Sequence, residues 1–138
     1  MNFKDKVIYV TGASLGIGYE IASVLLKQEA KVVITARNKE NLERAKNTLS
    51  KISDNVGAHA FDISDENELK KSMDNVYNHF GKIDGLVNNA PSIHPGMIKD
   101  MSLNQWRTNF KANLEGAFLT TNYVLPKMIE QESGSIVN

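Results

Sequence analysis

Cysteine is absent from the 138-residue sequence, and proline occurs only three times. Without cysteine there is neither a disulfide framework nor a thiolate metal site, which is compatible with the cytoplasm. An excess of one charge is also missing, because sixteen Lys and Arg residues balance sixteen Asp and Glu residues. This balance argues against nucleic acid and anionic membranes as partners, since both bind clustered positive charge.

Long apolar runs are absent as well. No segment approaches the roughly 18 apolar residues that a membrane span requires, and the N-terminus has no signal-peptide pattern. The three histidines are scattered, with no partner at metal-ligand spacing. We therefore expect a cytoplasmic protein with no membrane segment and no metal site, about one domain in size.

What the sequence does contain is an alternation of short apolar runs with longer amphipathic stretches. Runs rich in β-branched residues lie at 7–10, 32–35, 56–61, 83–87 and 135–137, and helical periodicity at 17–25, 39–52, 65–80 and 103–131. Ser64 is expected to cap the third helix. Such alternation is typical of βαβ crossovers, and continuous apolar strands indicate helices on both faces. The sequence predicts a single α/β domain over residues 1–138 with a doubly wound parallel sheet.

A glycine-rich loop, Thr11-Gly-Ala-Ser-Leu-Gly-Ile-Gly18, separates the first strand from the first helix. Glycine permits positive φ and close approach of backbone to a phosphate, and a helix N-terminus offers free N–H groups and a positive dipole end. An ordinary glycine-rich turn is the alternative. The position between strand and helix predicts nucleotide binding, although the spacing is neither the commonest dinucleotide fingerprint nor a P-loop.

With this loop the chain resembles the N-terminal, cofactor-binding part of the classical short-chain dehydrogenase/reductase family, whose signature is Thr-Gly-x-x-x-Gly-x-Gly. Further matches are Asp62-Ile63, Asn88-Asn89-Ala90, Asn113 in Asn-Leu-Glu-Gly, and residues 134–138, so the resemblance covers essentially the whole chain. It implies a Rossmann-like fold and assigns Asn113 to the active site. The cofactor-binding residues that it implies are Gly12, Ser14, Leu15, Gly16, Ile17, Gly18, Arg37, Asn38, Asp62, Ile63, Asn89 and Ala90.

The same resemblance implies NADP(H) rather than NAD(H) as cofactor. At the end of the second strand, Ala36 occupies the position where NAD-dependent members carry aspartate, and Arg37 follows. A carboxylate there would repel a 2′-phosphate, whereas a guanidinium can pair with it. The alternative is that Arg37 is only a solvated residue opening the next helix. Pro91 departs from the glycine of the family's Asn-Asn-Ala-Gly motif, so the loop beside the nicotinamide is expected to differ in shape.

The residues that perform the family's chemistry are missing from this chain. Hydride transfer between the nicotinamide and a carbonyl or alcohol uses a serine, a tyrosine, and a lysine four residues after the tyrosine, all beyond the fifth strand. Only Tyr123 and Lys127 have this spacing, and they precede the fifth strand, so we interpret the spacing as chance. The chain is expected to be an inactive portion of an oxidoreductase, truncated after the fifth strand and lacking the C-terminal catalytic part. A non-catalytic dinucleotide-binding or interaction module of the same fold is the alternative.

Two expectations concern partners. His94, in the loop after the fourth strand, is a candidate contact for a small carbonyl or alcohol substrate. The last helix is expected to carry one broad apolar face, and the family resemblance implies that this face joins subunits of a homo-oligomer, although covering its own sheet would explain the same pattern. The residues of this face are Phe110, Leu114, Ala117, Phe118, Val124, Leu125 and Met128.

Overall fold

A computed structural model describes residues 2–93 and 95–138 of the chain. Five parallel strands form one sheet in the order β3-β2-β1-β4-β5. The central strand is β1, whose Tyr9 pairs with Val33 on one side and with Leu86 on the other. The predicted parallel α/β sheet is therefore confirmed. The strands are β1 (Val7–Thr11), β2 (Lys31–Ala36), β3 (Val56–Ala60), β4 (Gly85–Val87) and β5 (Ser135–Val137).

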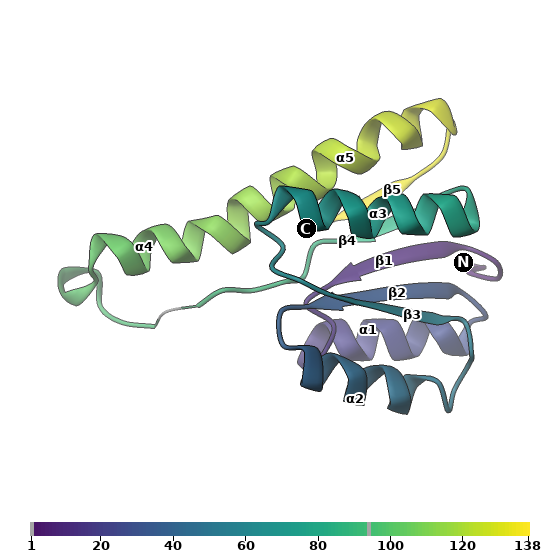
Figure 1. The fold of residues 1–138 in the computed structure, drawn as a ribbon, viewed down its shortest axis with the longest axis horizontal. Coiled ribbons are helices and arrows are strands. Elements are labelled where there is room, and N and C mark those ends of the chain that lie inside the picture. Colours follow the sequence, from purple (N-terminus) through teal and green to yellow (C-terminus); the bar gives the residue numbers. More distant parts are fainter. Residues whose placement is uncertain (1, 94) are drawn as a thin grey trace.

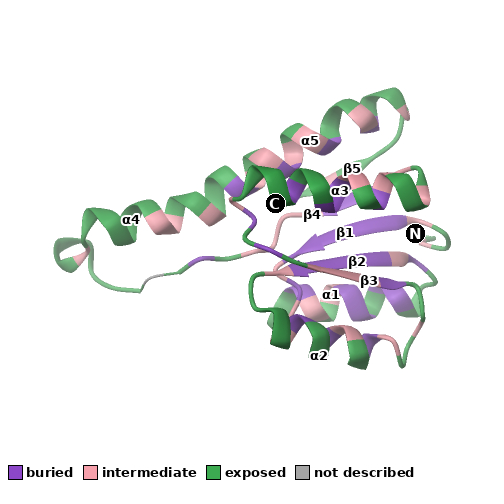
Figure 2. Cartoon of the chain, viewed as in Figure 1, coloured by how far each residue is buried: buried purple, intermediate pink, exposed green. Residues whose placement is uncertain are grey.

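Helices cover both faces of the sheet (Figure 1). Helices α1 (Gly16–Lys27) and α2 (Lys39–Leu49) lie on one face, and α3 (Glu66–Phe80) and α5 (Ala117–Glu130) lie on the other. Alternate residues of each strand point to opposite faces, so Ile8 packs in the α1–α2 layer and Tyr9 in the α3–α5 layer. Figure 2 shows the buried residues concentrated in the strands and on the inner sides of these helices.

The strand order reverses beside β1. From β1 the chain proceeds to β2 and β3 on one side, and then returns to place β4 on the other side of β1. The loops that leave β1 and β4 therefore diverge at the carboxyl ends of neighbouring strands. A crevice at such a reversal is the usual ligand-binding position in open parallel sheets.

The long helical region predicted over 103–131 is confirmed, because the chain is helical without a break from Leu103 to Glu130, but it is not α-helical throughout. The chain forms α4 (Leu103–Phe110), a π-helical segment (Lys111–Gly116) and α5. The predicted single apolar face is wrong, because Val124 and Met128 are buried whereas Phe118 and Leu125 are exposed. All four residues belong to α5, so the difference arises within one helix. Only the narrow stripe with Val124 and Met128 is covered by the core, and the neighbouring positions of the predicted face stay exposed. Helix α4 has no buried residue and projects from the body of the molecule (Figures 1 and 2).

Smaller differences concern the ends of elements. Asp65, rather than the predicted Ser64, caps α3, and its carboxylate accepts hydrogen bonds from the backbone N–H groups of Asn67 and Glu68. The third strand ends at Ala60, the fourth begins at Gly85, and α2 ends at Leu49. A short 3₁₀ helix, Ile98–Asp100, lies in the loop after β4. None of the described helices is long and apolar enough to cross a membrane.

A buried hydrogen-bond chain links the sheet to α3. The Tyr9 hydroxyl lies 2.5 Å from Ser72 Oγ, which lies 2.6 Å from His59 Nδ1. Because both hydroxyl protons find acceptors when Tyr9 donates to Ser72 and Ser72 donates to His59, this chain favours neutral His59 with its proton on Nε2. Burial lowers the pKa of His59, and the positive charge of Lys46 lowers it further.

Asp84 ties β1 to β4 at the end of the sheet opposite the crevice. Its carboxylate accepts hydrogen bonds from the backbone N–H of Val7 (2.9 Å) and from Lys6 Nζ (3.0 Å), and it also pairs with Lys82. Burial alone would raise the pKa of Asp84, but the hydrogen bonds from Val7, Lys82 and Lys6 and the positive charge of Lys82 lower it.

Candidate nucleotide-binding site

The glycine-rich loop lies directly against the loop that leaves β4. Gly12 has φ of +65°, and a Cβ atom there would lie 2.5 Å from the Cα of Ala90. At Gly18 a Cβ atom would overlap the Asn89 side-chain amide and lie 2.8 Å from the carbonyl oxygen of Gly12. Gly16 has open space around it but a φ of +59°. Close approach therefore requires glycine at positions 12 and 18, and backbone conformation favours it at position 16.

Hydrogen bonds join the two loops. The Thr11 hydroxyl accepts from the backbone N–H groups of Asn89 (2.9 Å) and Ala90 (3.0 Å), and donates to the carbonyl of Val87 (3.2 Å). The Asn89 side-chain amide donates to the carbonyl oxygens of Thr11 and Gly12, both at 3.0 Å. Both amide hydrogens of Asn89 are thus used within the protein, so this side chain braces the glycine loop.

The N-terminus of α1 faces this crevice without a capping side chain. Leu15 occupies the N-cap position and makes no side-chain cap hydrogen bond. The first turn of α1, which begins at Gly16, carries no acidic residue. The initial N–H groups of a helix have no intrahelical acceptors, and the helix dipole adds partial positive charge there. This end of α1 is therefore suited to an anionic group.

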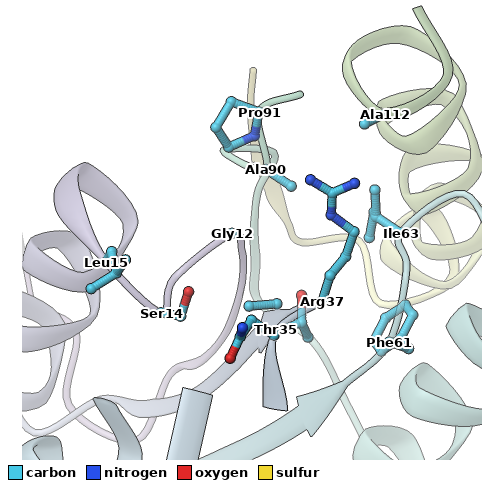
Figure 3. A pocket seen from close by; sticks show the side chains of 12 residues that line it. Gly12, Ser14, Leu15, Thr35, Arg37, Phe61, Ile63, Ala90, Pro91 and Ala112 are labelled. Carbon is cyan, nitrogen blue, oxygen red and sulfur yellow. The ribbon is translucent and has the colours of Figure 1, made fainter. Parts of the chain in front are cut away.

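A cleft of about 280 Å³ opens between the glycine loop, the end of β2 and the π-helical segment. Figure 3 shows Arg37 extending from the end of β2 toward Ile63 and Ala112 on the opposite wall. Most of the predicted cofactor-binding residues meet in this cleft, and the sequence reasoning missed Thr35, Phe61 and Ala112. The lining residues are Gly12, Ser14, Leu15, Thr35, Ala36, Arg37, Asn38, Phe61, Ile63, Ala90, Pro91 and Ala112.

Positive charge gathers at one rim of the cleft. Burial tends to raise the pKa of Asp62, but hydrogen bonds from the Ser64 backbone and hydroxyl (3.0 and 2.7 Å), with the nearby charges of Arg37 and Lys111, lower it. The Asn38 side chain lines the cleft and also caps α2 by accepting from the N–H of Asn41 at 2.8 Å. Among the residues that line the cleft, Arg37 is the one with a positively charged side chain.

Asn113 lies in the π-helical segment, beside a smaller hollow that shares Ile63, Ala90, Pro91 and Ala112 with the cleft. Its side-chain oxygen accepts from the N–H of Ser92 at 3.0 Å, and its amide donates to the carbonyl of Ser92 at 2.7 Å. Asn113 thereby fastens the loop after β4 to the π-segment. Both polar atoms of its side chain are therefore engaged by the Ser92 backbone.

Other predicted residues lie elsewhere. Ile17 is 75% exposed and belongs, with Phe3 and Val24, to an apolar groove along α1 rather than to the cleft. Asp62 is exposed at the rim, between the two lining residues Phe61 and Ile63. His94 lies outside the described residues.

The Tyr123–Lys127 pair lies between α3 and α5. The Tyr123 hydroxyl donates to Asp74, and Lys127 Nζ lies 4.6 Å from the ring centroid of Tyr77. Burial and the Asp74 carboxylate raise the pKa of Tyr123, which is opposite to what an acid/base tyrosine needs near neutral pH. None of these residues lines the cleft, which supports the interpretation that their spacing is accidental.

Among residues 2–93 and 95–138, no group of three or more His, Asp or Glu residues is arranged to hold a metal ion.

A parallel sheet with a glycine loop and an uncapped helix N-terminus at the strand-order reversal defines a Rossmann-like α/β fold with a crevice suited to an anionic ligand. The family model of the short chain dehydrogenases matches residues 6–138. The chain therefore belongs to the short-chain dehydrogenase family.

Individual relatives agree with this assignment. An uncharacterized oxidoreductase of Staphylococcus saprophyticus is 34% identical over 137 residues, which are 99% of this chain and 55% of that protein. The crystal structure of an NAD+-bound xylitol dehydrogenase matches with a TM-score of 0.95 and 30% identity, over 100% of this chain and 54% of that one. A metagenomic short-chain oxidoreductase in complex with NADP matches with a TM-score of 0.89 and 31% identity, over 99% and 61%. The chain spans about half the length of the curated relatives it matches.

Proposed function

We propose that the chain is the NADP(H)-binding portion of a short-chain oxidoreductase that transfers a hydride between NADPH and a small carbonyl or alcohol substrate. The observation that carries the cofactor preference is Arg37, which enters the cleft from the end of β2 where Ala36 leaves no carboxylate. One solved relative is bound to NADP and another to NAD+, so the preference rests on this chain's own side chains.

The residues of the cleft fit the phosphate groups of a dinucleotide cofactor. The glycine loop offers backbone without side chains, and the N-terminus of α1 offers N–H groups free of a capping side chain. In the proposal these groups hold the pyrophosphate, while Ile63 and Phe61 form an apolar wall beside the adenosine and Arg37 pairs with the 2′-phosphate. Bound NADPH would supply the hydride. Asn113 and Asn89 act indirectly, by fixing the two loops that shape the cleft.

The test compares NADPH and NADH binding in Arg37→Ala. A charge-assisted hydrogen bond contributes about 1.5–3 kcal/mol, so NADPH affinity should fall by about 10- to 100-fold, while NADH affinity stays nearly unchanged. Arg44→Ala is the matched control, because Arg44 is exposed on α2 and pairs with Glu40 away from the cleft. Equal losses for the two cofactors in a calorimetric titration would contradict the role of Arg37.

We also propose that the 138-residue chain binds cofactor without turning over substrate. The support is that Tyr123 and Lys127 lie between α3 and α5 and take no part in lining the cleft. Incubation with NADPH and a panel of carbonyl compounds should show no oxidation at 340 nm, and measurable turnover would refute the proposal. A non-catalytic dinucleotide-binding module would bind the cofactor equally well. The two alternatives are separated by measuring turnover in a protein as long as the relatives: a non-catalytic module would show none there either.

Self-association through the α4–α5 surface is part of the proposal. Val124 and Met128 already cover the chain's own sheet, yet Phe118 and Ile129 on α5 remain 63% and 67% exposed. The rings of Trp106 and Phe110 on α4 contact each other in a tilted arrangement, with centroids 4.6 Å apart, and both side chains are exposed too. Phe118→Asp should convert an oligomer to a monomer in sedimentation analysis, and a wild-type chain that is already monomeric would refute this part. The proposal also includes a cytoplasmic location, which fractionation of expressing cells tests.

A further inference from the structure

The π-helical segment contacts two different parts of the candidate site. Ala112 lines the cleft, and Asn113 fastens Ser92 in the loop after β4. Four residues after Ala112, Gly116 closes the segment and is buried. The side of Gly116 where a side chain would begin faces Ile63, which follows β3 and lines the same cleft.

The identity of Gly116 is explained by space and not by backbone conformation. Its φ and ψ are −59° and −45°, which any residue adopts in a helix. Alanine would favour the helix by about 1 kcal/mol relative to glycine. A Cβ atom, however, would lie 2.8 Å from Ile63 Cγ2 and 3.3 Å from Ile63 Cγ1. The missing side chain is therefore what lets Ile63 lie against the π-segment.

Ile63 cannot retreat easily from such a collision. It is only 6% exposed and packs in the α3–α5 layer of the core with Phe61 and Leu69. Restoring an ordinary contact of 3.4 Å from 2.8 Å requires a displacement of about 0.6 Å. Since Ile63 forms part of the cleft wall, movement away from the π-segment changes the shape of the cleft.

We propose that Gly116 is a positioning residue that sets the adenosine side of the cofactor cleft by seating Ile63 against the π-segment. This role rests on the proposed dinucleotide function. It predicts that enlarging Gly116 impairs binding of the adenosine half of the cofactor, and that shrinking Ile63 relieves the effect. Nicotinamide mononucleotide, which lacks the adenosine half, serves as the probe that Ile63 should not influence.

The experiment titrates 2′,5′-ADP, NADP+ and nicotinamide mononucleotide into wild type, Gly116→Ala, Ile63→Ala and the double variant. Gly116→Ala should weaken 2′,5′-ADP and NADP+ by about fivefold or more and leave the mononucleotide unaffected. In the Ile63→Ala background the same alanine should change affinity by less than about twofold, because the obstructing Cγ1 and Cγ2 atoms of Ile63 are gone. Gly57→Ala is the matched control, since a Cβ atom there meets Val33 at an ordinary 3.5 Å.

The outcomes separate the two proposals. A wild-type chain that binds neither 2′,5′-ADP nor NADP+ overturns the proposed function and this role with it. A wild type that binds, together with a Gly116→Ala variant of unchanged affinity, overturns the role of Gly116 alone, even if its unfolding midpoint falls. If Gly116→Ala does not fold, the double variant is compared with Ile63→Ala, and an affinity reduced by more than about twofold contradicts the proposal.

Discussion

Replacing Gly18 by alanine tests whether the Asn89 brace holds the glycine loop in place. The added Cβ would overlap Asn89 Nδ2 and lie 2.8 Å from the carbonyl oxygen of Gly12. Asn89 would have to give up its two hydrogen bonds to Thr11 and Gly12, at about 0.5–1.5 kcal/mol each. Overpacking adds about 1–3 kcal/mol, and the better helix propensity of alanine returns about 1 kcal/mol.

The expected net loss is about 1–5 kcal/mol in the free energy of unfolding, a large share of the roughly 5–15 kcal/mol of an ordinary domain. Urea unfolding followed by circular dichroism measures it. Gly57→Ala is the control, because its methyl fits beside Val33, and it should leave stability unchanged or raise it by about 0.4–1 kcal/mol.

A second background sharpens the test. In Asn89→Ala the atom that Gly18→Ala meets first is absent, so the same substitution should cost less there than in wild type. A Gly18→Ala protein as stable as wild type would refute the steric reasoning. Strict additivity of the two substitutions would show that Asn89 is not the group displaced.

Three further outcomes are expected. The pKa of Asp84 is lowered in the folded protein. The stability that its carboxylate contributes is therefore present above the ordinary aspartate pKa near 3.9 and is lost as the pH falls through the lowered pKa. Urea midpoints measured between pH 3 and 7 should show this loss in wild type and not in Asp84→Asn. The pKa of His59 is also lowered, so the stability contributed by neutral His59 is lost as the pH falls below about 6.5, and the loss should disappear in His59→Asn. Asn113→Ala removes the two side-chain hydrogen bonds to the Ser92 backbone. Hydrogen exchange at the Ser92 amide should therefore accelerate by at least about fivefold, while exchange at the Val10 amide is unaffected. An unchanged exchange rate at Ser92 would contradict the positioning role of Asn113.

The sheet and the glycine loop were predictable because their signals are local. Runs such as Val7–Val10 and Val32–Thr35 read as buried strands, and the handed βαβ connection leaves few ways to order them. Gly12 and Arg37 could be placed at one edge because parallel strands all end there. The conformation of each glycine and the contact with Ala90 still required coordinates.

The π-turn and the contacts across it were not predictable from pattern. A helical period averaged over 103–131 does not reveal where one turn widens, although two poor helix formers, Asn113 and Gly116, both lie in the π-segment. Gly116 and Ile63 belong to different βαβ units, so no local periodicity links them. At the start of α3, Ser64 and Asp65 are both good capping residues and adjacent, and the hydrogen bonds alone decide for Asp65.

The bonds between Thr11 and Asn89 join residues 78 positions apart in the sequence. Closing so long a loop is entropically costly and belongs to the slow, non-local part of folding. The crevice at the end of β1 therefore does not exist in a molecule that has only its first three strands in place. On the proposed function, titration with a nucleotide would count fully folded molecules in a preparation, and nucleotide added during refolding would draw the population toward the native state by mass action.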